Sequence, residues 1–217
     1  MRSIRESVYS KIRDDIAFGK YTPGERIIEG KLAKEFESSR SPIREALRQL
    51  EFEGLVVFER NKGVTIAKLS IVEVDEIYSL LSLLESYAAS ISAKVATKKD
   101  VVYLRSLNEK LGVAAKNVDL QAWLQNNLLF HNFICKGCGN GNLIQLVGVL
   151  RRRVYRYRYL AVSVPPGNFE CYLEDHAGIL KGCETNDSKM AQKHMSAHWK
   201  TIRNILLNYL NEIAPNY

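Results

Sequence analysis

Long apolar segments are missing from this sequence. No run reaches the roughly 18 residues that a membrane-spanning helix requires. The first residues, MRSIRESVYSKIRDDI, alternate charged with apolar side chains and lack the apolar block of a secretory signal. Apolar residues nevertheless make up 46% of the 217 residues, enough for a substantial core. We therefore expect one large or two modest domains in the cytoplasm, with no membrane partner.

Cysteine is scarce as well, with four residues in the chain. In the cytoplasm we expect all four to be thiols. Cys135 and Cys138 have a CxxC spacing, but no second pair follows and no strand–helix redox context surrounds them. We interpret them as small buried residues at a helix end.

An excess of acidic residues is also absent, since the formal net charge is +7 and the isoelectric point is about 9.2. This balance mildly favours a polyanionic partner. Residues 1–70 carry 14 basic and 11 acidic side chains, and residues 71–217 carry 17 and 13. The excess is therefore spread over both parts, and only the positions of the arginines can identify a DNA-binding domain.

The first part of the chain reads as short helices followed by a hairpin. Apolar residues recur at helical spacing over 4–18 and again over 28–36. A further helix is expected from Ser41, as its N-cap, to a stop at Gly54. Two β-rich runs, 55–58 and 64–67, then flank a basic tip that contains Asn61, Lys62 and Gly63. These elements predict a winged helix-turn-helix domain at residues 1–69.

Beyond residue 70 the sequence lacks convincing strands and internal repeats. Helical periodicity predicts helices at 72–96, 99–116, 119–137, 141–163, 169–185 and 187–212. The expected fold is therefore mainly α: an N-terminal winged helix-turn-helix, then an antiparallel all-α helical bundle at residues 70–217.

Three arginines form a basic face on the helix that follows the turn at 37–40. Arg40, Arg44 and Arg48 recur at intervals of four, apart from the apolar face made by Ile43, Ala46, Leu47 and Leu50. An arginine near the start of such a helix can bind a guanine in the major groove. The alternative is that the three arginines form a solvated face and pair with nearby glutamates. The two-helix pattern and the hairpin at 55–67, which would form the wing, favour DNA binding instead.

The same segments resemble the winged-helix head of the GntR family. The matching segments are Pro23-Gly24-Glu25-Arg26, Glu29 with Leu32-Ala33, Ser39 to Leu47, Leu50 with Glu53-Gly54-Leu55-Val56, and Lys62-Gly63. The resemblance implies that Arg40 and Arg44 are the main DNA contacts, helped by Ser41, Pro42 and Gly63. We add Arg48 and Lys62 as further contacts. The resemblance also implies a homodimer on a near-palindromic, double-stranded operator.

All four histidines lie in the predicted bundle, at His131, His176, His194 and His198. Imidazoles that converge from several helices can bind a transition metal, although hydrogen-bonded core histidines are the ordinary alternative. The bundle resembles the FCD-type effector domain found in the fatty-acid-regulator branch of GntR proteins, through Phe130-His131, Glu174-Asp175-His176, Asp187 and His198. That resemblance implies a divalent ion (Zn²⁺, Ni²⁺ or Mn²⁺) held by Asn127, His131, His176 and His198. Asn127 stands where the family usually has Asp, which should lower metal affinity.

The effector site departs from the family as well. Leu81 stands where the family often has an arginine that holds a carboxylate effector. The run RRRVYRYRY at 151–159 either has solvated arginines or places one, such as Arg152 or Arg156, in the ligand cavity. Together these features predict a repressor whose DNA affinity responds to a small-molecule effector. The expected effector is an organic acid that binds through its carboxylate. The rival interpretation is a metal-dependent enzyme built on the helical domain.

Overall fold

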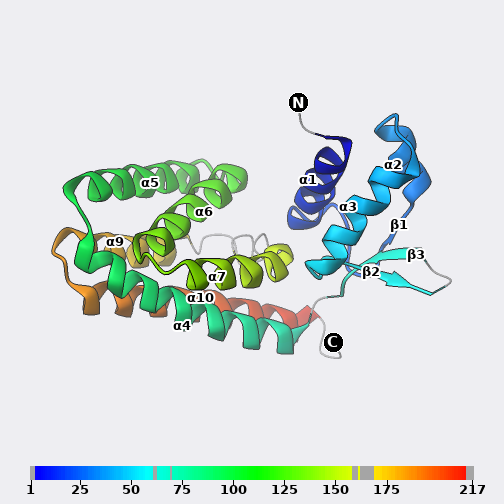
Figure 1. Cartoon of the computed structure of the whole chain (residues 1–217). Helices are drawn as coiled ribbons and strands as arrows, with labels where there is room; N and C mark the ends of the chain where they lie inside the picture. The colour runs from blue at the N-terminus through cyan, green and yellow to red at the C-terminus, as the bar shows by residue number, and fades with distance from the viewer. Residues whose placement is uncertain (1–2, 61–62, 69, 158–160, 162–168, 214–217) are drawn as a thin grey trace. The chain divides into compact units, whose positions relative to one another are not determined.

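A computed structural model describes residues 3–60, 63–68, 70–157, 161 and 169–213 (Figure 1). The chain forms two compact units. Described residues up to Ser70, together with 152–157, form the first unit, which we call the head. Ile71–Arg151 and the described residues from 161 onward form the second, which we call the helical unit. The head thus includes a segment, 152–157, that the periodicity of the sequence assigned to the bundle.

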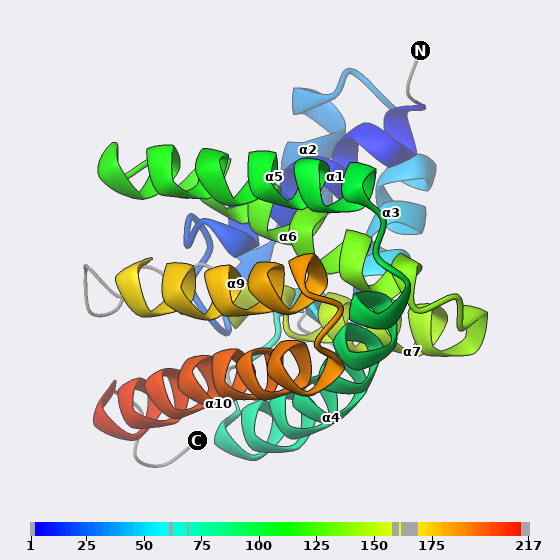
Figure 2. The same cartoon turned by 90° about the vertical axis from the view of Figure 1, so that its left-hand side faces the viewer.

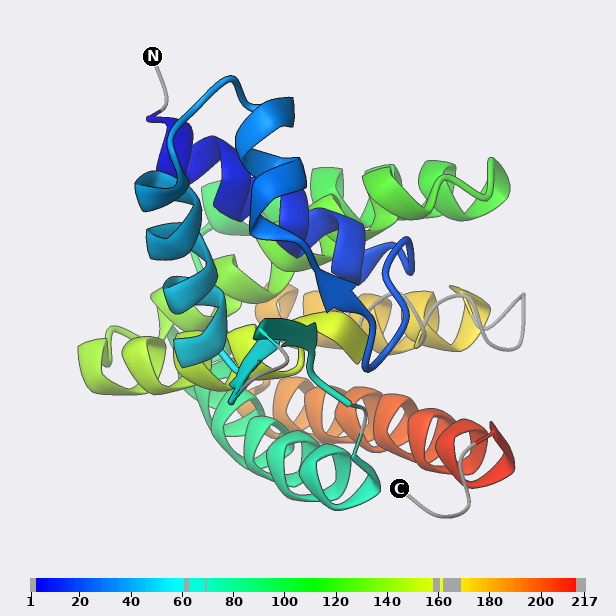
Figure 3. The same ribbon diagram turned by 90° about the vertical axis from the view of Figure 1, so that its right-hand side faces the viewer.

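The N-terminal part of the head combines helices with a small antiparallel sheet (Figure 3). Its helices are α1 (Ile4–Ala17), α2 (Glu29–Glu35) and α3 (Arg40–Phe52), and its strands are β1 (Arg26–Ile27), β2 (Val56–Glu59) and β3 (Gly63–Ile66). The strand order is β1-β3-β2, and β2 pairs with β3 as the expected hairpin. Strand β1 was not predicted, because two residues are too few to show an alternation.

The ends of α3 confirm one predicted signal and correct another. Gly54 has a φ of +72°, which suits glycine, and the Leu55 N–H donates to Leu50 O at 2.9 Å, so it ends the helix as expected. The N-cap prediction was wrong, because the helix begins at Arg40 and Ser39 holds the N-cap position. Pro42 still fits there, since first-turn N–H groups have no partner within the helix.

The helical unit is an all-α bundle. Its helices are α4 (Ile71–Val95), α5 (Lys98–Lys116), α6 (Leu120–Gly137), α7 (Gly141–Arg153, whose last two residues belong to the head), α9 (Phe169–Glu184) and α10 (Ser188–Ile213). Helix α10 runs antiparallel to α4 (Figure 2): Asn186 donates to Ala93 O at 2.8 Å near one end, and Arg203 pairs with Asp75 near the other. The predicted boundaries are confirmed to within two residues, with one exception.

That exception is the helix expected at 141–163. Helix α7 ends at Arg153, and a 3₁₀ helix, η1 (Tyr155–Tyr157), follows. The tyrosine side chains are engaged in the head rather than in a continued bundle stripe, as shown below. Within the described part of the chain, no helix is both long and apolar enough to cross a membrane.

Candidate nucleic-acid interface and metal centre

Helix α3 separates its buried and exposed residues by face. Ile43, Ala46, Leu47 and Leu50 are fully buried in the core of the head. Arg40, Ser41, Arg44 and Arg48 are exposed, and Pro42 is partly buried. The fold therefore presents the predicted DNA contacts of this helix to solvent, because the apolar face fixes the rotation of α3 about its axis.

The three arginines differ in how firmly they are held. Among the described residues Arg40 forms no ion pair, and Arg44 Nε lies 3.6 Å from Glu29 Oε1. Arg48 is bound more tightly, with Nη1 2.8 Å from Glu51 Oε2 and its guanidinium 3.9 Å from the centroid of the Phe58 ring. Exposed ion pairs contribute little, so the contact that sets Arg48 apart is the Phe58 ring, and Arg40 and Arg44 are the more available for DNA.

The wing begins at Gly63, which is exposed and has a φ of +82°. Lys62 lies outside the described residues. Arg26 was not predicted as a DNA contact. It is an exposed residue on β1, and its Nη2 lies 3.5 Å from the position that a Cβ on Gly63 would occupy. The pairing of Arg26 with Thr65 places this guanidinium beside the wing, and only the pairing of β1 with β3 could have shown it.

Three of the four histidines meet in the core of the helical unit. His131 of α6, His176 of α9 and His198 of α10 are buried, and each offers a ring nitrogen within 4.8 Å of the others. We call these three residues the histidine cluster. His194 lies apart from it, with Nδ1 3.6 Å from Asp175 Oδ1. The cluster joins residues up to 67 positions apart, so only the tertiary fold brings them together.

The cluster fits a divalent metal ion. His131 Nε2 and His198 Nε2 are 3.2 Å apart, within the roughly 3.0–3.4 Å that separates two nitrogens each bound about 2.1 Å from one ion. Both ring nitrogens of His176 and Nδ1 of His198 are buried and have no hydrogen-bond partner among the described residues. Buried polar atoms without partners are costly, and a metal would satisfy them. Burial, with help from neighbouring histidines, holds the pKa of His176 and of His198 well below 6.5, so both are neutral and able to ligate.

Asn127 also fits the predicted ligand set. It lies one helical turn before His131 on α6, and its Oδ1 is buried without a hydrogen-bond partner in the described part of the chain. A buried amide oxygen can ligate a cation without the charge of a carboxylate. The unsatisfied atom is therefore consistent with a weak fourth ligand.

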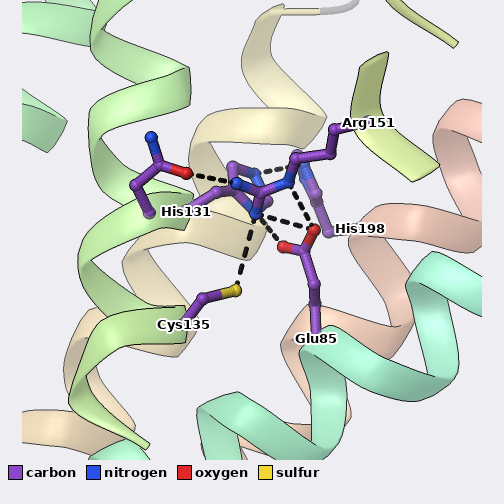
Figure 4. A network of polar contacts seen from close by, with 6 residues as sticks. Glu85, His131, Cys135, Arg151 and His198 are labelled. Carbon is purple, nitrogen blue, oxygen red and sulfur yellow. Dashed lines mark hydrogen bonds and ion pairs between the residues drawn. The ribbon is translucent and has the colours of Figure 1, made fainter. Parts of the chain in front are cut away.

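A buried ion-pair network adjoins the cluster (Figure 4). Glu85 Oε2 lies 2.8 Å from His131 Nδ1, and Glu85 Oε1 accepts a hydrogen bond from Arg151 Nε at 2.8 Å. Arg151 Nη1 also donates to Asn132 Oδ1 at 2.6 Å, and its Nη2 lies 3.6 Å from Cys135 Sγ. Burial alone would raise the pKa of Glu85, but the neighbouring Arg151 and His131 lower this pKa to about 2. Glu85 is thus ionised and orients His131, which is the usual support for a metal-ligating imidazole.

The arginine beside the histidines is therefore Arg151, which sequence analysis did not select. Arg152 belongs to the head, where its Nε lies 3.5 Å from Glu53 Oε1. Arg156 lies in η1, and its side chain is outside the described residues. Leu81, which stands where the family often has an arginine, is fully buried. Only the rotation of α7 distinguishes Arg151 from its neighbours, and the repeated arginines conceal that rotation in the sequence.

Comparison with protein families decides the identity of both units. The family "Bacterial regulatory proteins, gntR family" matches residues 4–66, and the FCD domain matches residues 76–201. The chain belongs to the GntR family. It joins a GntR winged helix-turn-helix to an FCD domain, as its resemblance to the family implied.

Relatives of this GntR protein agree with that assignment. An HTH-type transcriptional regulator of Bacillus subtilis, YdhC, is 30% identical over 96% of this chain and 93% of its own length. The Escherichia coli transcriptional repressor GlaR is 29% identical over 89% of this chain and 91% of its own. The solved structure of E. coli McbR/YncC shares the fold, with a TM-score of 0.83 at 22% identity over 97% of this chain and all of that one. The family and these relatives are regulators, so the chain is a transcriptional regulator and not an enzyme.

Proposed function

We propose that this GntR protein is a cytoplasmic repressor that binds a near-palindromic operator as a homodimer and changes its DNA affinity when the helical unit binds a small molecule. The exposed pair Arg40 and Arg44 on α3 carries the proposal, because the apolar face of the same helix is locked into the core of the head. Ser41 at the first turn can hold a phosphate, and Gly63 lets the wing approach the DNA backbone closely. Arg26 joins these contacts as an additional cation at the wing, and Lys62 at its tip is expected to contact phosphate.

The helical unit would hold one divalent ion, Zn²⁺, Ni²⁺ or Mn²⁺, through His131, His176, His198 and Asn127. This nitrogen- and oxygen-rich set does not select among these metals. When bound, the ion would supply a fixed positive charge in a buried site. Glu85 keeps His131 oriented for that role, and burial holds the pKa of His176 and of His198 well below 6.5, so these two stay neutral at physiological pH.

We infer that the effector is a small organic acid. Arg151 supplies a mostly buried guanidinium beside the histidine cluster, and a guanidinium binds carboxylates through paired hydrogen bonds. Glu85 now occupies one side of that guanidinium, so an effector carboxylate would compete with Glu85 for Arg151. This inference places the effector arginine at 151 rather than at Arg152 or Arg156.

We infer that helix α4 forms the dimer surface, with a second copy of this chain as the occupant. Its exposed apolar residues recur at helical spacing along one face, at Val72, Leu80, Leu83 and Tyr87. Leu83 is 67% exposed and lines a groove between the small residues Ser79, Ser82 and Ser86 of α4 and the longer side chains of Lys189, Gln192 and Lys193 on α10. Small side chains let a partner helix approach closely, and an apolar face with this spacing suits a two-fold contact between identical helices.

Operator binding tests the function directly. The purified protein should retard DNA taken from upstream of its own gene in preference to unrelated DNA. Arg44→Ala should weaken specific binding by about 1–3 kcal/mol and relax the preference at one base position, since it removes a guanine contact. Arg48→Ala is the matched control on the same helix and should weaken binding less, because Arg48 is already paired with Glu51. Wild-type affinity in Arg44→Ala would contradict the proposed docking of α3.

A further inference from the structure

Helix α7 is shared between the two units. Arg151 belongs to the helical unit, where it binds Glu85, and the next residue, Arg152, belongs to the head. No loop intervenes, because α7 continues to Arg153 and η1 follows almost at once. A single helical turn therefore connects a residue of the histidine neighbourhood to residues of the DNA-binding head.

The first contact beyond Arg151 reaches the end of the recognition helix. Arg152 Nε lies 3.5 Å from Oε1 of Glu53, the C-cap residue of α3. Glu53 is buried, and its Oε2 accepts a hydrogen bond from Tyr9 OH at 2.8 Å. A change in the position of Arg152 would therefore alter the charge balance at the buried carboxylate of Glu53, at the C-terminal end of α3.

The second contact reaches α1. Tyr155 OH donates to Asp14 Oδ1 at 3.1 Å, and the Arg13 guanidinium lies 5.0 Å from the centroid of the Tyr155 ring. The Tyr155 ring also packs against the hydrophobic core of the head. Since α1 and α3 share that core, Tyr155 can influence the helix that presents Arg40 and Arg44.

The third contact reaches the connection to α4. Tyr157 is fully buried, and its hydroxyl accepts from the Ser70 N–H at 2.7 Å and donates to Ser70 O, 3.3 Å away. Ser70 immediately precedes α4, the helix that carries Glu85. The Tyr157 hydroxyl thus forms hydrogen bonds with both the N–H and the carbonyl oxygen of Ser70, the residue that joins the head to α4.

We propose that residues 151–157 act as a relay that couples the histidine cluster to the position of α3. A metal or ligand that engages His131 or Glu85 changes the partners of Arg151. Helix α7 transmits that change to Arg152, and the adjoining η1 passes it to Tyr155 and Tyr157. The relay deepens the proposed function and rests on it, because the regulated quantity is operator affinity. It is a coupling free energy between two sites and must act in both directions.

The test measures operator affinity of the full-length protein under two perturbations of the cluster. One is saturation with Zn²⁺ after chelator treatment, and the other is Arg151→Lys, which keeps the charge beside Glu85 but loses the forked geometry. Each is applied to the wild type, to Arg152→Gln/Tyr155→Phe, and to the control Lys200→Gln, which removes an exposed cation of α10. The Tyr155→Phe change keeps the packed ring and removes only the hydroxyl.

We expect at least one perturbation to change the operator dissociation constant about fivefold or more in the wild type and in the control. In Arg152→Gln/Tyr155→Phe the same perturbation should change it less than about twofold, while Zn²⁺ affinity stays as in the wild type. If Arg152 and Tyr155 had a purely structural role, the double variant would change operator affinity by the same factor with and without the perturbation of the cluster. An undiminished response in the double variant, or no response in the wild type, would overturn the relay. Failure of the proposed function is distinct, because the unperturbed wild type would then show no specific binding.

Discussion

At the scale of single residues, the most informative atoms are those that the fold buries without a partner. Both ring nitrogens of His176, Nδ1 of His198 and Oδ1 of Asn127 are in this state among the described residues. Such atoms cost free energy in a protein core and are retained where they serve a site. They favour the proposed metal centre over three ordinary core histidines.

Metal titration of variants tests this reading. His176→Ala should weaken Zn²⁺ binding by more than about 100-fold, because losing even an outer-shell partner costs about 10–100-fold. Asn127→Asp should tighten it by about tenfold or more, since a carboxylate adds a negative charge at the ligand position. His194→Ala is the matched control outside the cluster and should bind as the wild type does. Calorimetry of untagged protein gives these constants, and an unaffected His176→Ala would show that the cluster holds no metal.

At the scale of elements, each helix of the helical unit gives one face to the core, and α4 keeps a second apolar face in solvent. Val72, Leu80, Leu83 and Tyr87 lie on that second face, whereas Tyr78, Leu81 and Glu85 are buried. A helix that is apolar on two sides is usually covered by a partner. This pattern supports a dimer through α4.

Charge insertion on that face provides the test. In sedimentation the wild type should have about twice the 24.7 kDa chain mass at micromolar concentration. Leu83→Glu should shift the protein toward monomer, because it places a carboxylate in the apolar contact and the two-fold axis repeats that buried charge on both copies. Val113→Glu, at an exposed position of α5, is the control and should remain dimeric. If Leu83→Glu were as dimeric as the control, the dimer surface would lie elsewhere.

Periodicity predicted the elements well and their joins less well. It placed α4, α5, α6, α9 and α10 because each buries residues three and four apart. It extended the helix at 141 too far, because tyrosines at 155 and 157 have the same spacing whether they line a bundle or bind Asp14 and Ser70 in the head. Local patterns report which residues are buried but not against which partner.

At the scale of the whole molecule, the buried ionisable groups of the helical unit link stability to pH. His176 and His198 have pKa values well below 6.5 because of burial, so below pH 6.5 the unfolded chain binds protons that the folded chain does not. Proton binding by these two histidines therefore leaves the free energy of unfolding unchanged above about pH 6.5 and lowers it as the pH falls below that value. Glu85, with a pKa of about 2 against an ordinary 4.5, adds a second loss below about pH 4.5.

Denaturant unfolding of the metal-free protein, measured between pH 8 and pH 5, should show the loss of stability caused by the two histidines. The denaturant concentration at the midpoint of unfolding should fall below about pH 6.5. His176→Phe should flatten the fall, because an aromatic ring of similar shape fills the site without a proton-binding group. His194→Phe should leave the slope unchanged, since His194 is half-exposed and outside the cluster. Equal slopes in all three proteins would mean that other groups set the acid sensitivity.

The sequence by itself determined the winged helix-turn-helix and the bundle, because amphipathic spacing and turn residues act locally. It also determined the family and predicted the histidine ligands, through motifs that keep their spacing. Only the tertiary structure decided which arginine lies beside the histidine cluster, that Glu85 bridges Arg151 and His131, and that residues 152–157 belong with the head. Those facts depend on the rotation of α7 and on contacts between segments as many as 141 positions apart, which no local pattern encodes.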